Sequence, residues 1–130
     1  MPALAVLSAV LVWYTRGQRH ELELRKREVV YQTALASYSQ AVPVGMTRQS
    51  VERYLRKNGT AFRQMCCIDE PAAVVDRVLI GKEKPPWMCS ERTVYVAFQS
   101  AAHDSHQSWH AGEADVLKRV TIYQWSEGCL

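Results

Sequence analysis

The chain has 130 residues, with 16 basic and 13 acidic side chains that give a formal net charge of +3 at pH 7. Once an apolar N-terminal segment is set aside, this length corresponds to one domain with a modest hydrophobic core. The small basic excess is not arranged as a nucleic-acid-binding groove, and the sequence contains no glycine-rich phosphate loop, dinucleotide-binding fingerprint or zincin motif. We therefore expect no nucleic-acid partner and no cofactor.

Residues 3–14 are almost wholly apolar and end in Trp13 and Tyr14, residue types that are enriched at membrane interfaces. As a helix they span about 18 Å, whereas a bilayer crossing takes about 20 residues. A cleaved signal peptide is disfavoured, because no basic residue precedes the run and no small-x-small cleavage site lies before Thr15. A buried core helix is the other alternative, although charged residues come directly after the run. We predict that residues 1–16 anchor the chain in a lipid bilayer as a single-pass helix whose start is clipped or mis-assigned.

Two signals bear on the side of the membrane that the domain occupies, and they conflict. Basic residues lie after the apolar run at Arg16, Arg19, Arg25, Lys26 and Arg27. Taken alone, the positive-inside rule places the domain that these residues precede in the cytoplasm. The cysteine content favours an oxidising compartment instead. We expect the domain on the extracytoplasmic side, in the periplasm.

Residues 17–42 are expected to continue the anchor as one helix, because no proline interrupts them before Pro43. One face of this helix is lined by apolar residues at helical spacing, namely Leu24, Tyr31, Leu35, Tyr38 and Val42. Such a stripe is typical of a helix that packs on its own sheet. The alternative is a coiled-coil stalk through which the chain forms a homodimer.

A second, short helix is predicted from its ends. Thr47 is placed to cap the first turn through its hydroxyl, and Asn58-Gly59 is a typical stop signal, because glycine tolerates the left-handed conformation. Val51, Tyr54 and Leu55 recur at helical spacing and should form the buried face. The charged residues should lie mostly on the exposed side, and they are Arg48, Glu52, Arg53, Arg56 and Lys57.

The motif G-M-T-R-x-x-V-x-x-Y-L at residues 45–55 resembles the opening of the SmpA/OmlA (BamE-like) domains of bacterial envelope lipoproteins. The resemblance implies that a short helix and a three-stranded antiparallel sheet make up residues 43–130. It also implies a role in interactions within the bacterial envelope. The lipidated cysteine of that family and the Gly-x-Pro after its helix are not present in this chain.

After Gly59 the pattern changes to strands. Thr93–Ser100 is the clearest, because it is rich in β-branched and aromatic residues. Three further segments are expected to contribute strands: Thr60–Cys67, Arg77–Lys82 and Leu117–Ser126. The order predicts an α+β fold in which three or four antiparallel strands carry a layer of helices on one face.

The four cysteines are Cys66, Cys67, Cys89 and Cys129. Structural zinc sites usually show paired C-x-x-C knuckles, which are missing here, and a catalytic thiol would need a histidine partner. Buried free thiols are the remaining alternative to disulfides. We predict two disulfides. Adjacent residues of a strand face opposite ways, so we expect Cys66 and Cys67 to pair with Cys89 and Cys129, one with each, and not with one another.

Candidate site residues are few. His103, His106 and His110 have spacings that would suit a metal ion if the segment were helical, but a solvated loop is the simpler interpretation. The acidic residues are scattered, so no catalytic residue is proposed. Trp87 in the P-P-W-M-C segment is a candidate anchor for a partner, as are Tyr54 and Arg53, although such a tryptophan also commonly covers the edge of a core.

These observations favour a non-catalytic, membrane-anchored envelope protein that binds or scaffolds another envelope or membrane protein. The alternative from a different class is a small metal-binding protein or enzyme that uses the histidine segment. A third interpretation is a cytoplasm-facing sensor domain on a clipped membrane helix.

Overall fold

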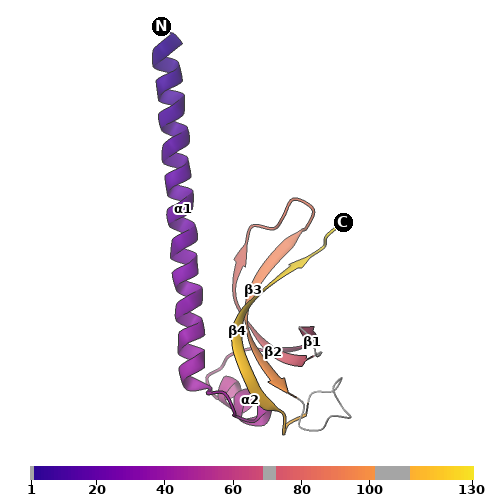
Figure 1. Cartoon of the computed structure of the whole chain (residues 1–130). Coiled ribbons are helices and arrows are strands. Elements are labelled where there is room, and N and C mark those ends of the chain that lie inside the picture. The colour runs from indigo at the N-terminus through magenta and orange to yellow at the C-terminus, as the bar shows by residue number, and fades with distance from the viewer. Residues whose placement is uncertain (1, 69–72, 102–111) are drawn as a thin grey trace. The chain divides into compact units, whose positions relative to one another are not determined.

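The computed structural model describes residues 2–68, 73–101 and 112–130, and it contains two helices followed by four strands (Figure 1). The elements are α1 (Pro2–Ala41), α2 (Arg48–Lys57), β1 (Arg63–Ile68), β2 (Ala73–Glu83), β3 (Glu91–Ala101) and β4 (Val116–Glu127). The chain divides into two compact units, Met1–Gln32 and Thr33–Leu130. The predicted α+β class is confirmed, and the sheet has four strands.

Helix α1 is continuous through the predicted anchor and stalk, as expected from the absence of internal proline. Gly17 does not break it. The charged residues that begin at Arg16 end the apolar run, and within the described residues no helix is long and apolar enough to cross a membrane. The transmembrane part of the predicted fold is therefore not confirmed.

Helix α2 begins and ends where its capping residues predict. The backbone N–H of Ser50 donates to Oγ1 of Thr47 at 3.3 Å. At the other end, the N–H of Gly59 donates to the carbonyl of Arg56, and the N–H of Thr60 to that of Leu55. These two bonds form a Schellman motif, which requires the positive φ of 66° that Gly59 adopts.

The four strands form one antiparallel sheet in which the spatial order is the chain order, β1-β2-β3-β4. In the centre of the sheet Val78 lies opposite Val96, and Val96 lies opposite Ile122. Because side chains alternate along a strand, this row of residues lies on one face. That face is therefore apolar across three neighbouring strands.

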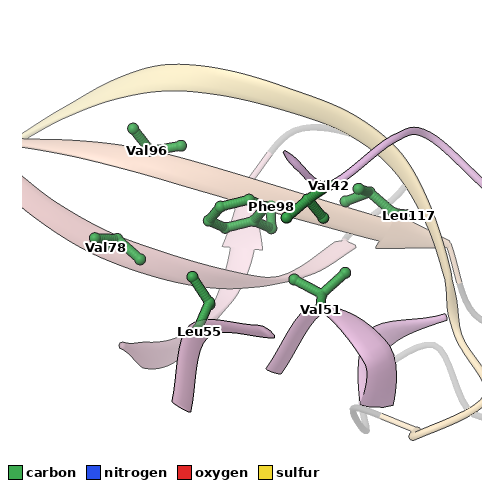
Figure 2. Packing of buried hydrophobic residues seen from close by; sticks show 7 residues of the cluster. All are labelled: Val42, Val51, Leu55, Val78, Val96, Phe98 and Leu117. Atoms are coloured by element: carbon green, nitrogen blue, oxygen red, sulfur yellow. The ribbon is translucent and has the colours of Figure 1, made fainter. Parts of the chain in front are cut away.

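The core lies between this face and the helices of the second unit. Val51 and Leu55 of α2 pack there with Phe98 of β3 and Val42, which comes directly after α1 (Figure 2). The Phe98 ring also meets Tyr38 edge to face, with 5.5 Å between the ring centroids. Burial of each such side chain contributes about 1.5–3 kcal/mol. Tyr38 and Val42 thus serve as packing residues on the chain's own sheet, the first of the two interpretations of the stripe.

The cysteine pairing differs from the prediction. Cys89 is bonded to Cys129, so neither partner is available to the cysteines of β1. The physical reason is the strand order: β1 and β4 are the opposite edges of the sheet, which separates Cys66 from Cys129. Cys89 and Cys129 flank paired ends of β3 and β4, where Glu91 lies opposite Glu127. The side chain of Cys67 lies outside the described residues.

Candidate functional site

The sheet has a second face, which points away from α2. On β3, Val96 and Phe98 belong to the helix-covered core, so Tyr95 and Ala97 point to the other side. A small apolar cluster lies on this side. It is formed by four strand residues, Val75, Ala97, Met65 and Tyr123. We call this side the second sheet face.

The second sheet face contains a pocket of about 390 Å³. Its walls come from the start of β1 and the two residues before it, from β2 and β3, and from the end of β4. The lining residues are Ala61, Phe62, Arg63, Arg77, Leu79, Lys82, Glu91, Thr93, Tyr95 and Glu127.

The charges of the pocket are sorted along the strands by the register of the sheet. Arg63 lies directly opposite Arg77. The next residue of β2 on the same face is Leu79, which lies opposite Tyr95. At the far end of the same face Glu91 lies opposite Glu127. The pocket therefore changes from a basic end, through an apolar and aromatic middle, to an end that holds Glu91 and Glu127 together with Lys82.

Arg77 is the most constrained side chain of the pocket. Its guanidinium carbon lies 4.6 Å from the centroid of the Tyr95 ring, a distance typical of a cation–π contact. One terminal nitrogen donates to the sulfur of Met65 at 3.2 Å, and Nε is buried with no hydrogen-bond partner among the described residues. The side chain is half-buried and lies over the ring of Tyr95, while its Nε has no acceptor among the described residues.

Lys82 has a different environment. Its ammonium group donates to the carboxylate of Glu91, and that hydrogen bond raises the pKa of Lys82. Since Glu91 compensates Lys82, the uncompensated positive charge of the pocket lies at Arg63 and Arg77.

A separate group of charges is buried beneath α2. Arg48, the first residue of the helix, donates to the carbonyl of Val74 at 2.8 Å. Its guanidinium lies 3.5 Å from a carboxylate oxygen of Asp76 and 3.6 Å from one of Asp115. The prediction that Arg48 lies on the exposed side is wrong, because the first turn of α2 is turned towards these two carboxylates.

Burial raises the pKa of the Asp76 carboxyl from 3.8 to about 7. The guanidinium of Arg48 opposes this shift, and the neighbouring carboxylate of Glu52 adds to it. The backbone N–H of Arg48 also donates to the carbonyl of Asp115 at 2.7 Å. This group therefore joins α2 to β2 and to the residue before β4, and it does not line the pocket.

The partner-binding candidates from the sequence lie elsewhere. Trp87 is 91% exposed in the β2–β3 connection, so it does not cover the edge of the core, and its role as a partner anchor stays a prediction. Tyr54 packs against the helix–sheet core, and Arg53 is exposed on α2. The structure does not bring the three together, and none of them lines the pocket.

The metal-site candidates His103, His106 and His110 fall in residues 102–111, which lie outside the described residues. In the part of the chain that is described, no group of three metal-ligating side chains is found. The pocket and the buried charges were therefore not predicted from the sequence.

Comparisons with protein families, with curated proteins and with solved structures find no match to this chain. The resemblance of residues 45–55 to BamE-like domains therefore stays a prediction.

Proposed function

We propose that this chain is a non-catalytic interaction module of a bacterial envelope, which contacts a lipid bilayer through the start of α1 and a partner protein through its sheet. The observation that carries the proposal is the exposure of apolar residues on every side of the first turns of α1. These side chains are between 48% and 79% exposed, and they are Leu4, Val6, Leu7, Val10, Leu11, Val12, Trp13 and Tyr14.

A helix that is apolar all round is stable only when an apolar environment surrounds it. Residues 3–14 extend about 18 Å, which suits insertion into part of a hydrocarbon core about 30 Å thick. Trp13 and Tyr14 would lie at the headgroup level, where such residues are favoured. The basic residues after them would meet anionic headgroups, each contributing about 1 kcal/mol near such a surface.

The disulfide between Cys89 and Cys129 supports an extracytoplasmic location for the sheet, since disulfides persist in oxidising compartments and are rare in the cytosol. The periplasm, predicted from the cysteine content, is thus the compartment that we propose for residues 33–130.

A binding role is supported by the residues of the second sheet face. Arginine and aromatic side chains are enriched in the central parts of protein interfaces, and here Arg77 and Tyr95 are held together beside the exposed Leu79. The carboxyl group with the raised pKa, Asp76, is covered by α2 and does not belong to the pocket lining. The pocket residues favour recognition over acid–base chemistry.

Flotation with vesicles of phosphatidylethanolamine and phosphatidylglycerol tests the membrane contact. We expect the whole chain to float with the vesicles, and the variant Leu7→Asp/Leu11→Asp to remain at the bottom. The matched control is Leu22→Asp/Val30→Asp, which adds the same charge at exposed positions of α1 outside the apolar run. Equal loss of flotation in both variants, or no flotation of the unaltered chain, would contradict the proposal.

A further inference from the structure

We infer that the second sheet face binds an acidic segment of a partner protein, whose carboxylate is held by Arg63 and Arg77 and whose neighbouring apolar side chain enters the pocket beside Leu79 and Tyr95. The inference rests on the proposed role as an interaction module, but not on the membrane contact.

Two positive charges lie side by side at the basic end of the pocket. Arg63 and Arg77 are direct cross-strand partners on β1 and β2, and like charges at such positions destabilise a sheet. No described acidic residue forms an ion pair with either of them. A carboxylate placed between the two guanidinium groups would remove this repulsion.

The side chain of Arg77 is restrained by its contacts with Tyr95 and Met65. The guanidinium lies over the ring of Tyr95, and this contact reduces the side-chain entropy that would be lost on binding. Arginine presents its N–H groups as a rigid fork that matches a carboxylate. Nε of Arg77 is buried without an acceptor among the described residues, so an incoming carboxylate would meet the terminal nitrogens of the guanidinium instead.

The middle and the far end of the pocket decide the class of partner. Leu79 is 52% exposed and lies across from Tyr95, so the middle of the pocket suits an apolar side chain. At about 390 Å³ the pocket lies in the range of ~300–1,000 Å³ that binding clefts commonly have. At its far end Lys82 pairs with Glu91 but not with Glu127, and this remaining negative charge would repel the repeated phosphates of a nucleic acid. A polypeptide that carries one carboxylate next to an apolar residue suits the basic end and the apolar middle of the pocket.

A display library of random twelve-residue peptides, selected against the whole chain, is the probe. We expect enriched peptides to carry Asp or Glu next to an apolar residue. The affinity of the best peptide, measured by fluorescence polarisation, should fall about tenfold or more for Arg63→Gln/Arg77→Gln, because hydrogen bonds to charged groups contribute ~1.5–3 kcal/mol. Replacing the peptide's own acidic residue by its amide should have a similar effect.

The matched control is Lys57→Gln/Lys118→Gln, which removes two exposed positive charges outside the pocket and should change the affinity less than twofold. Arg63→Gln alone is the safeguard against misfolding, because Arg63 is exposed; it should weaken binding without lowering the melting temperature. Equal weakening by the control variant, or a library result with no acidic preference, would overturn the inference.

Two further measurements separate other outcomes. A single-stranded oligonucleotide that bound through Arg63 and Arg77, with no binding of acidic peptides, would assign the face to a polyphosphate and overturn the inference. Peptides that bound equally well to Arg63→Gln/Arg77→Gln would also overturn it, while leaving the proposed role of the chain as an interaction module intact.

Discussion

Arg48 and Asp76 face one another inside the protein, with 3.5 Å between Nη1 and Oδ1, and each side chain is at most 2% exposed. One residue opens α2 and the other lies in the first half of β2. Val74, two residues before Asp76, accepts a second bond from the same guanidinium. The position of α2 on the sheet therefore depends on polar contacts as well as on the apolar core.

Removal of Arg48 should be strongly destabilising. Arg48→Met leaves two buried carboxylates, Asp76 and Asp115, without their guanidinium, and breaking a buried ion pair typically costs about 3–5 kcal/mol. Urea unfolding at pH 7, followed by circular dichroism, measures the free energy of unfolding. Arg53→Met on the exposed side of the same helix is the control and should change it by less than ~0.5 kcal/mol. Equal effects of the two substitutions would mean that the buried group does not stabilise the fold.

The raised pKa of Asp76 predicts a dependence of stability on pH. Its folded-state pKa of about 7 exceeds the usual 3.8, so the folded chain binds the proton more tightly than the unfolded chain does. The corresponding stabilisation is fully present below pH 3.8 and is lost as the pH rises through 7. Asp76→Asn cannot titrate there, so the melting temperature of the unaltered chain should fall relative to this variant between pH 4 and pH 8. A constant difference across that range would refute the raised pKa.

Gly59→Val should lower stability more than Gly59→Asn. The added Cβ at Gly59 meets no atom within 4 Å, so the effect comes from the backbone, whose φ of 66° is unfavourable for a β-branched residue. Such strain costs on the order of 1–3 kcal/mol, whereas asparagine tolerates the left-handed region. Thermal unfolding of both variants measures the difference. Equal melting temperatures would show that the helix end does not need this conformation.

Loss of the disulfide should destabilise the chain by up to about 4 kcal/mol, the chain-entropy estimate for a closed loop of this size, because Cys89 and Cys129 are 40 residues apart. The measurement is urea unfolding of Cys89→Ser/Cys129→Ser under non-reducing conditions. Export to an oxidising compartment, followed by alkylation and mass spectrometry, should leave both residues unlabelled in the unaltered chain. Labelling of both would contradict the bond and the proposed location.

Local signals predicted the fold well. Thr47 and Gly59 specify the ends of α2 through contacts with residues a few positions away, and the content of β-branched residues located β3. Val74, Asp76 and Val78 alternate along β2, so Asp76 lies on the helix-covered side. This pattern is visible in the sequence. Arg48 was misplaced because one turn of a short helix does not show which of its charged residues meets a buried partner.

The pocket could not be predicted in the same way. The pairing of Arg63 with Arg77 depends on the register between β1 and β2, and the contact of Arg77 with Tyr95 depends on the next pair of strands. The position of the cysteines likewise depends on strand order, since β1 and β4 lie at opposite edges. Long-range register is thus the information that single-sequence patterns lacked.

The hydrogen bonds at the start of α2 also constrain the order of events during synthesis. Thr47 forms an isolated bridge with Val116, and Gly45 donates to the carbonyl of Leu117, whose own N–H donates to Met46. The loop before α2 is therefore completed by β4, which leaves the ribosome after β1, β2 and β3. The hairpins of a sheet in chain order form from local contacts and can assemble early, but α2 can be locked in place only when β4 has emerged.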